Sequence, residues 1–520
     1  MAFPPHFDRT PSTTPHLLTA DYVRDQLVPR TVDLNGKRHR PDGEYVLYWM
    51  QSTHRLDENW GLRAAIRAAD RLDLPVVIHQ GLDPTYPHAS ARHHTFILQG
   101  ARETARRAEA LGLHYQFVLR AHHDEDRRVV DRLAARAYVV FTDLFPTAGV
   151  RERLNRFADR VQCRVLAVDS VCTVPSGLFE KAEYAARTIR PKIARLLDHA
   201  IEPVEDRVPK RAVSESLRQS LCALIRDGGN PGPLPIATMT DADIADIVSA
   251  CTIDHTVPAV TLEGGSAAAE ARWQHFLTTG LPRYDTQHNE ASDAGSTSRL
   301  SPYLHYGQIA PARLVREARA AGIDAQSLDA FVQQLVTWRE LSFNWCLRTP
   351  AFDQIAALPA WAQRTMEAHA HDERPVQYTL AQLERAETGD TLWNAAQREL
   401  LTQGVIHNYP RMLWGKTMLL WTANPETARC WLFHLNDKYA LDGRDANSVG
   451  GIMWCLGLWD RPWGNRPIWG GLRPMSTARA KTKFDVDGYI ARVNTAHDAD
   501  APSRGRMPDA SIDHLPLPGF

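Results

Sequence analysis

Hydrophobic and polar residues follow two different patterns along the chain, and the change falls near residue 260. In the first part, short apolar runs alternate with stretches that are apolar on one helical face. The runs lie at residues 45–50, 75–79, 114–119, 138–141 and 165–169, and residues 60–72 and 91–111 are among the amphipathic stretches. This alternation predicts an α/β domain built on a doubly wound parallel sheet. No GxGxxG motif follows the first predicted strand, so the standard dinucleotide-binding fingerprint is absent.

From about residue 261 the pattern is helical and predicts an all-α domain. The expected helices include residues 267–278, 310–321, 328–346, 379–387 and 393–404. We therefore expect a loose arm (1–40), an α/β domain (41–180), an interdomain linker (181–260), a helical domain (261–497) and a disordered tail (498–520).

Length and composition agree with a two-domain globular protein. The chain has 520 residues, of which 44% are hydrophobic and 23% charged. Its formal net charge of −1 gives no overall nucleic-acid signature, so a DNA partner requires basic residues gathered on one face. The seven cysteines are scattered, which predicts reduced thiols and no metal site. No signal peptide or membrane span is predicted, and we expect a cytoplasmic monomer, nucleoid-associated if bacterial.

The stretch from residue 407 to 463 mixes many tryptophans with polar residues of the kind that need buried partners. Pro410 and Asn424 suit the start and the stop of a helix. Between them Arg411, Trp414 and Trp421 fall on one face, and the two indoles are separated by about 10 Å of helix rise. On this segment alone a buried apolar face is the better explanation of the tryptophans, because a stripe of Trp is usually core. The mixture favours a large, flat, partly polar ligand, and the indole spacing suits electron hopping.

Two further groups of residues are candidates for ligand binding. Residues 295–304 place hydroxyls and backbone N–H groups ahead of a helix whose first turn holds Pro302, an arrangement that suits an anion. An ordinary N-cap loop is the alternative. Arg411 and Asp442 can form an ion pair that orients a flat ligand, or a plain structural salt bridge.

Several long motifs resemble the photolyase/cryptochrome family, and within it class II cyclobutane pyrimidine dimer photolyases. They are VLYWMQSTHRLDENWGL, EYAARTIRPKI, TSRLSPYL, RMLWGK, LNDKYALDGRD and KFDVDGYI. The resemblance implies an FAD-dependent carbon–carbon lyase that repairs UV-damaged DNA in blue light, with FAD in the helical domain. It also implies that the N-terminal domain can hold an antenna chromophore of the deazaflavin or folate type.

The resemblance assigns roles to individual residues. Those implied at FAD are Tyr284, Thr297, Ser298, Arg299, Leu300, Ser301, Asn408, Arg411, Asn436 and Asp442. The implied electron path to the flavin is Trp393, Trp414 and Trp421, and the implied lesion contacts are Trp338, Met412 and Trp454. Arg339, Arg461 and Arg473 are the candidate DNA contacts. Asn408 is a mild departure, because class II members more often carry Gly there.

Gln334 is the departure that matters for function. Cyclobutane dimer photolyases carry Glu four residues before the lesion-clamping Trp, which here is Trp338. Gln can donate a hydrogen bond but cannot carry charge or supply a proton. Members that repair the (6-4) photoproduct have Gln at the comparable place, but Met412 stands where one of their histidines would be. Slow dimer repair, (6-4) repair, cryptochrome-like signalling and a non-catalytic DNA-binding flavoprotein therefore stay open.

Overall fold

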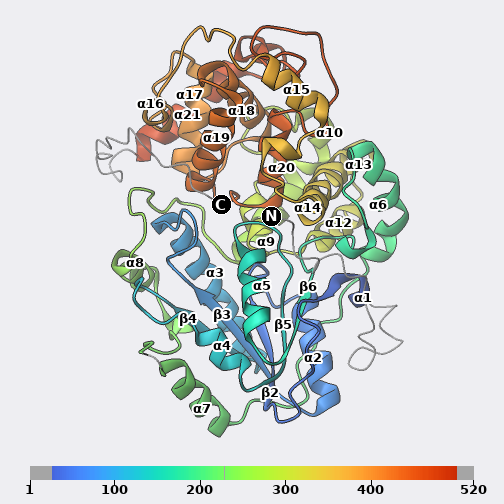
Figure 1. Cartoon of the computed structure of the whole chain (residues 1–520), viewed down its shortest axis with the longest axis vertical. Coiled ribbons are helices and arrows are strands. Elements are labelled where there is room, and N and C mark those ends of the chain that lie inside the picture. The colour runs from blue at the N-terminus through green and yellow to red at the C-terminus, as the bar shows by residue number, and fades with distance from the viewer. Residues whose placement is uncertain (1–25, 228, 501–520) are drawn as a thin grey trace.

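The N-terminal part of the molecule is a six-stranded sheet (Figure 1). The computed structural model describes residues 26–227 and 229–500. The strands are β1 (Thr31–Asp33), β2 (Tyr45–Met50), β3 (Val76–Leu82), β4 (His114–Leu119), β5 (Ala137–Asp143) and β6 (Arg164–Val168). Their order is β1-β6-β5-β2-β3-β4, and only β1 is antiparallel to its neighbour. The predicted doubly wound α/β fold is confirmed.

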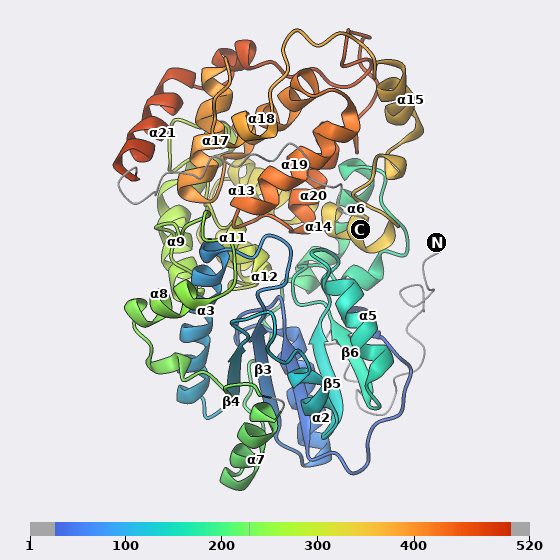
Figure 2. The same ribbon diagram turned by 60° about the vertical axis from the view of Figure 1, so that its left-hand side comes forward.

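Helices cover both faces of the sheet, so every residue of β2 is buried. Val46, Tyr48 and Met50 pack in one cluster with α2 (Trp60–Leu72). The alternate residues of β2 join a second cluster that includes side chains of α4 (Val129–Ala134) and α5 (Val150–Arg160). This alternation is the period of two that a strand imposes. The long helix α3 (Ala91–Ala110) follows β3 (Figure 2).

Part of the range expected to be a loose arm belongs to the α/β core. Helix α1 (Leu27–Arg30) leads directly into β1, and residues 31–33 pair with β6. Arg30 is buried and donates hydrogen bonds to the carbonyl oxygens of Cys172 and Thr173, at 2.8 and 2.6 Å. The expectation is therefore wrong for these residues, and residues 1–25 lie outside the described chain.

The segment expected to be a linker packs closely against both parts of the molecule. Its helices are α6 (Ala186–Ala200), α7 (Glu215–Arg226) and α8 (Asp241–Ala250), with a short 3₁₀ turn at Ile236–Thr238. Another 3₁₀ turn, Ser176–Leu178, precedes the segment. Arg190 of α6 donates to the side chain of Gln333, at 2.7 Å, in the helical part. Arg132 of α4 bonds the carbonyl oxygens at the end of α7, and α8 packs on α3.

The remaining chain is helical, apart from one isolated β-bridge, over the described residues 261–500. Its α-helices are α9 (Ser266–Thr279), α10 (Tyr284–Gln287), α11 (Ser301–His305), α12 (Pro311–Ala320), α13 (Ala325–Val332), α14 (Arg339–Arg348), α15 (Ala360–Ala368), α16 (Leu380–Glu384), α17 (Thr391–Gln403), α18 (Asn408–Trp421), α19 (Pro425–Tyr439), α20 (Ala446–Cys455) and α21 (Val486–Asp500). Four short non-α turns complete it: η5 (Leu281–Arg283), η6 (Gln333–Trp338), η7 (Ile355–Ala357) and η8 (Thr477–Thr482). Residues 498–500 of the expected tail lie in α21, and the rest of that tail is outside the described chain.

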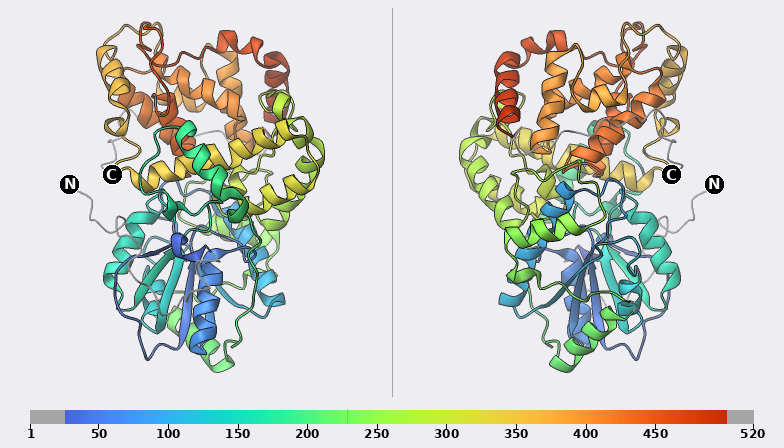
Figure 3. Two further views of the ribbon diagram at one scale, coloured as in Figure 1. Left: turned by 90° about the vertical axis from the view of Figure 1, so that its right-hand side faces the viewer. Right: turned by 90° about the vertical axis from the view of Figure 1, so that its left-hand side faces the viewer.

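The helical part sits over the carboxyl ends of the parallel strands (Figure 3). The chain just after β2 touches it, since His54 donates its backbone N–H to the carbonyl oxygen of Tyr306, at 3.0 Å. Arg92 of α3 reaches further, because its guanidinium bonds the carbonyl oxygens of Leu400 and Tyr439, at 3.0 and 2.6 Å. These carbonyls lie at the ends of α17 and α19. One buried side chain of the α/β part thus satisfies helix-terminal acceptors of the other part.

Candidate active site

Gln334 and Trp338 lie on one turn of π-helix. The helix predicted over 328–346 is present as α13, η6 and α14, and residues 333–338 between the two α-helices have π geometry. Such a turn inserts an extra residue per turn and is frequent at functional sites. Gln334 is exposed and Trp338 half-buried, whereas Leu335, Val336 and Thr337 between them are buried. The π turn therefore presents Gln334 and Trp338, four residues apart, on its less buried side.

Helix α20 lies between the helices that carry Trp338 and Met412. A Cβ on Gly450 would meet Ser342 Oγ at 2.4 Å, so α20 approaches α14 closely at this glycine. The next residue, Gly451, faces the Met412 methyl group of α18, where a Cβ would stand 3.7 Å from it. Trp454 is half-buried one turn further along α20. The packing thus brings the helices of three predicted lesion contacts together.

Arg411 and Asp442 form the predicted ion pair. The two guanidinium nitrogens donate to the two carboxylate oxygens at 3.1 and 2.5 Å, which is a bidentate arrangement. Both side chains are largely buried. Arg411 Nε is also buried and has no partner among the residues that the structure describes. One donor of the pair, the Nε–H of Arg411, is therefore available to bond a ligand.

The amide of Asn436 is held in one orientation. Its Nδ2 donates to Asp437 Oδ1 at 2.8 Å and to Ser448 Oγ at 2.5 Å. Asp437 Oδ1 also accepts the backbone N–H of Arg444 at 2.9 Å, and burial raises the pKa of this carboxyl. Because both amide protons are used, the Asn436 carbonyl oxygen is the atom left to accept a hydrogen bond. Asn408 is exposed at the start of α18.

The loop of residues 295–300, which precedes α11, is held by side chains of α17. Arg299 has a left-handed backbone (φ 52°), and its guanidinium bonds the side chains of Gln403 and Glu399. Glu399 is fully buried, and it also accepts a hydrogen bond from Arg492 at 3.1 Å. Burial opposes its ionisation, but Arg299 and Arg492 hold the pKa of Glu399 below its ordinary value.

With its guanidinium turned to α17, Arg299 anchors the loop. The loop residues Thr297, Ser298 and Ser301 are half-exposed, and Leu300 is buried. Tyr284, whose predicted role is at the same end of the cofactor, is buried against the rings of Phe276 and Phe331, with centroids 5.8 Å away in each case.

The three predicted electron carriers are in ring contact. The rings of Trp393 and Trp414 are stacked at 6.2 Å, and those of Trp393 and Trp421 meet edge to face at 5.3 Å. Trp393, on α17, is therefore the middle member, although Trp414 and Trp421 are the two that share α18. All three are buried, and Trp421 also meets the half-buried ring of Tyr378, at 5.1 Å.

Arg461 and Arg473 gather on an exposed tryptophan that sequence reasoning did not select as a site. The Arg473 guanidinium lies 4.7 Å and that of Arg461 5.0 Å from the ring centroid of Trp463, whose side chain is 38% exposed. Asp460 fixes Arg473 through an ion pair of 3.0 Å. An aromatic ring flanked by two arginines suits contact with nucleic acid. The signal in the sequence is RPWGNR, where Trp463 stands between two arginines.

Arg339 does not lie at this surface. It is 5% exposed, donates to the carbonyl oxygen of Val171 at 2.7 Å and lies over the ring of Phe343. A DNA phosphate cannot reach it in this structure, so the expected phosphate contact is wrong for Arg339. Its neighbour Glu340 is buried too and accepts the backbone N–H groups of Thr173 and Val174. Both residues tie the helix of the π turn to the chain after β6.

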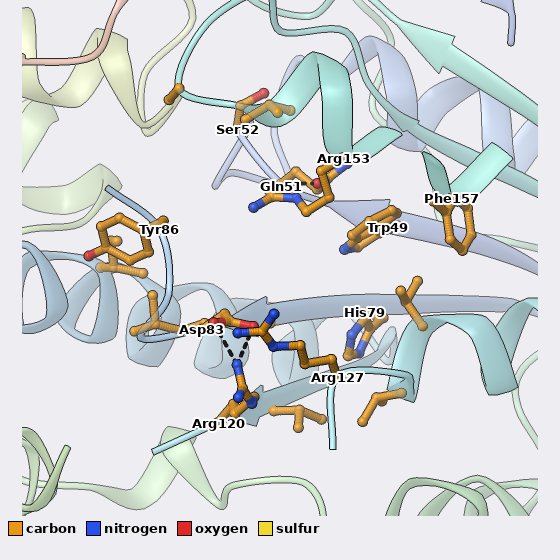
Figure 4. Close-up of a pocket in the computed structure, with 18 of the residues that line it drawn as sticks. Trp49, Gln51, Ser52, His79, Asp83, Tyr86, Arg120, Arg127, Arg153 and Phe157 are labelled. Atoms are coloured by element: carbon orange, nitrogen blue, oxygen red, sulfur yellow. Dashed lines mark hydrogen bonds and ion pairs between the residues drawn. The ribbon is translucent and has the colours of Figure 1, made fainter. Parts of the chain in front are cut away.

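A second candidate site lies at the carboxyl ends of β2 and β3, in the α/β part (Figure 4). It is a cavity of about 250 Å³ beside the place where the strand order reverses, which is the usual ligand position in such sheets. Its wall includes the edge-to-face pair Trp49 and Phe157, with centroids 4.9 Å apart. His79 is buried in this wall, and burial lowers its pKa to about 4, so the ring is neutral at pH 7. Asp83 and Arg120 form an ion pair of 2.9 Å at the rim.

Among the described residues, no cluster of three or more His, Cys, Asp or Glu side chains could hold a metal ion. No helix within the described ranges is long and apolar enough to cross a membrane.

Comparison with known proteins identifies the family. The family model described as DNA photolyase matches residues 46–210. A deoxyribodipyrimidine photo-lyase from Methanothermobacter thermautotrophicus is 33% identical over 470 residues, which cover 90% of this chain and 99% of that protein. The chain belongs to the DNA photolyase family. A second photo-lyase of this family, from Arabidopsis thaliana, is 33% identical over 458 residues and covers 86% of this chain and 89% of its own.

The fold agrees with this assignment. The structure of a cryptochrome from Synechocystis sp. PCC6803 superposes with a TM-score of 0.61 at 15% identity, over 86% of this chain and 88% of that one. At this identity the match concerns the fold alone, and it confirms the predicted combination of an α/β part with a helical part.

The polar groups of the helical part fit the FAD that DNA photolyases use. A bidentate ion pair, an amide with a free carbonyl oxygen and an unpartnered Arg411 Nε suit the edge of a ring system that both donates and accepts hydrogen bonds. The half-exposed hydroxyls of residues 297–301 suit a diphosphate.

Proposed function

We propose that this protein is an FAD-dependent DNA photolyase that repairs cyclobutane pyrimidine dimers in light. The buried contact of Trp393 with Trp414 and Trp421 is the structural observation that carries the proposal. Packing alone does not require three easily oxidised rings in consecutive contact, whereas reduction of a flavin through the protein does. The photo-lyases that match this chain over most of its length support the same function.

The helical part would bind FAD through residues already described. Arg411 and Asp442 would orient the ring system, Asn436 would offer its carbonyl oxygen to it, and Asn408 would border it. The hydroxyls of Thr297, Ser298 and Ser301, with the backbone of Arg299 and Leu300, would hold the diphosphate. Tyr284 would close that end of the site. When bound and reduced, FAD supplies an electron to the dimer on absorbing light and receives it back after the ring has split.

The lesion would enter from the side of the π turn. Trp338 and Trp454 would stack on an extruded dimer, and Met412 would contact it from α18. Gln334 would donate its amide N–H to a carbonyl oxygen of the dimer, where a carboxyl group would bind more strongly. Arg461, Trp463 and Arg473 would contact the DNA backbone or the bases beside the lesion.

The cavity at β2 and β3 is the proposed site of an antenna chromophore of the deazaflavin or folate type. Its aromatic wall suits a flat ring system, and the arginines near its rim suit an anionic tail. Addition of either chromophore should produce an absorption band that stays with the protein on gel filtration. A His79→Trp variant, which fills the cavity, should lose that band and keep the flavin.

A repair assay tests the proposal as a whole. The purified protein, loaded with FAD and chemically reduced, is illuminated with blue light in the presence of one oligonucleotide with a cyclobutane dimer and one with a (6-4) photoproduct. We expect restoration of the first only, and none in the dark. Exposed Gln334 is the observation that favours the second candidate, a protein with another lesion or with a signalling role. Repair of the (6-4) oligonucleotide, or of neither, would establish that candidate.

A further inference from the structure

Lys416 is a buried cation beside Trp454. It lies on α18 in the motif RMLWGK, its side chain is 0% exposed, and its Nζ is 4.9 Å from the centroid of the Trp454 ring. Nζ has no hydrogen-bond partner within residues 26–227 and 229–500. A buried ammonium without a partner is costly, and a methionine would fill the same space without that cost. The site therefore needs an explanation other than packing.

The groups around Lys416 do not neutralise it. The carboxylate that acts on it is that of Asp460, which follows α20, but this group is already paired with Arg473 at 3.0 Å. Cys455, on α20, is a neutral thiol, because burial raises its pKa to about 11. Arg473 lies 5.6 Å from the centroid of the same Trp454 ring, but its charge is balanced by Asp460. Within the described chain, Lys416 is thus the cation beside this indole that lacks a paired carboxylate.

We propose that Lys416 is a positioning residue for the lesion clamp: its ammonium supports the Trp454 ring from the protein side and makes the ring less electron-rich toward the lesion. A cation draws π density toward itself, and the interaction is stronger when both groups are desolvated. The carbonyl oxygens of a pyrimidine dimer are electron-rich, so they pack better on a depleted ring than on an ordinary indole. The inference rests on the proposed function, because it assumes that Trp454 contacts a dimer.

The charge of Lys416 is adjustable within the range of ordinary assays. Burial lowers its pKa to about 8, and the positive charge of Arg473 acts in the same direction. Above this pH the side chain becomes neutral and the support of the ring should weaken.

The test compares DNA affinities across pH 6.5 to 9.5 for the FAD-loaded full chain. Dissociation constants are measured for matched duplexes with and without one cyclobutane thymine dimer. The readout is the preference ratio, which is the constant for the undamaged duplex divided by that for the dimer duplex. In the wild type we expect the ratio to fall about five- to tenfold as pH rises through 8. In Lys416→Met the ratio should be low and independent of pH, whereas Lys416→Arg should keep it high at all pH values. Lys210→Met, an exposed lysine of the linker segment, is the control for loss of one charge.

Two outcomes are decisive. A ratio that is unchanged in Lys416→Met, or equal losses for both duplexes, would overturn the inference and leave the proposed function standing. No preference for the dimer in the wild type at any pH would overturn the proposed function, and the inference with it. FAD content and thermal midpoint identify a variant that has failed to fold, and the pH profile of the wild type still tests the proposal in that case.

Discussion

The indole N–H of Trp393 donates to the backbone carbonyl oxygen of Trp414, at 3.0 Å, while their rings lie nearly parallel, 13° apart. The N–H of Trp414 in turn donates to the side chain of Gln397, at 3.0 Å. Two buried indoles are thus fixed both by ring contact and by hydrogen bonds. Rings held so closely keep their electronic overlap constant, which is what a path for electrons requires.

Loss of the last indole should break this path. In Trp421→Phe most of the apolar area stays, but the easily oxidised ring is gone. We expect photoreduction of bound oxidised FAD to slow at least tenfold, whereas repair by chemically reduced protein persists. Flash absorption at the flavin bands gives the first quantity and an oligonucleotide assay the second. Trp431→Phe on α19 is the control, because it removes a half-buried indole that is not in ring contact with the three. Equal effects of both variants would show that these rings are packing alone.

FAD retention should depend on the ion pair of Arg411. We expect the purified protein to bind about one FAD per chain, without a covalent bond. Asp442→Asn leaves the buried guanidinium without its counter-charge, which should weaken FAD binding by about 2 kcal/mol, or some 30-fold. Glu426→Gln is the control, because it weakens an arginine–carboxylate pair of the same helical part, with Arg429. FAD titration followed by flavin fluorescence measures both, and unchanged affinity in Asp442→Asn would exclude this site for the ring system.

DNA affinity should fall steeply with salt despite the net charge of −1. Arg461→Ala and Arg473→Ala should each reduce the slope of log affinity against log salt by about one. Arg226→Ala on α7, an exposed arginine far from the helical part, should leave the slope unchanged (Figure 1). Buried Arg339→Ala should also leave the slope unchanged but lower the free energy of unfolding by about 1–3 kcal/mol. A shallow slope in the wild type would argue against a basic DNA-binding face.

Glu340 should make stability depend on pH. Burial raises the pKa of Glu340 from 4.5 to about 7, although Thr173 and Arg339 oppose the rise. Between these values the folded protein holds a proton that the unfolded chain has released, so the free energy of unfolding falls as pH rises from 4.5 to 7. This group should contribute at most about 3 kcal/mol to that fall. Denaturant unfolding of wild type and Glu340→Gln at pH 5 and 7.5 isolates it, and parallel pH profiles would refute it.

Gln334 should set the efficiency of repair. A carboxyl group at this exposed position of the π turn could stabilise the negative charge that develops on a dimer more strongly than an amide can. We therefore expect slow but measurable dimer repair in the wild type, and a gain in Gln334→Glu of no more than about 100-fold. The quantum yield of repair by reduced protein is the measurement, with Gln333→Glu on the same turn as control. If Gln334→Glu leaves repair unchanged or abolishes it, Gln334 serves another lesion or signalling.

The sheet could be predicted almost completely because most of its strands are short, largely apolar runs. The expected bounds of β2 and β4 are those of the structure, as are those of α2. β1 could not be found this way, since it has three half-buried residues and is held by β6 and by Arg30 rather than by its own pattern. The segment 181–260 is polar on its outer side, which hid three helices that pack on both parts of the molecule.

The candidate site was harder, because sequence fixes neither burial nor partners. The pairing of Arg411 with Asp442 followed from residue types, and the structure contains it. Arg339 looked like a surface cation beside Trp338, but the π turn rotates it inward to the carbonyl oxygen of Val171. The unpaired charge of Lys416 was likewise invisible, because only the fold shows that no acid reaches its ammonium.

Arg92 has a consequence for light harvesting. By holding the ends of α17 and α19 from α3, it removes the hinge that a two-part molecule would otherwise have. Transfer of excitation between two chromophores falls with the sixth power of their separation and depends on the angle between their transition dipoles. A pigment in the cavity at β2 and β3 and a flavin among the helices would keep a single separation and a single angle. The efficiency of excitation transfer between them would therefore be fixed by the fold and would not fluctuate with domain motion.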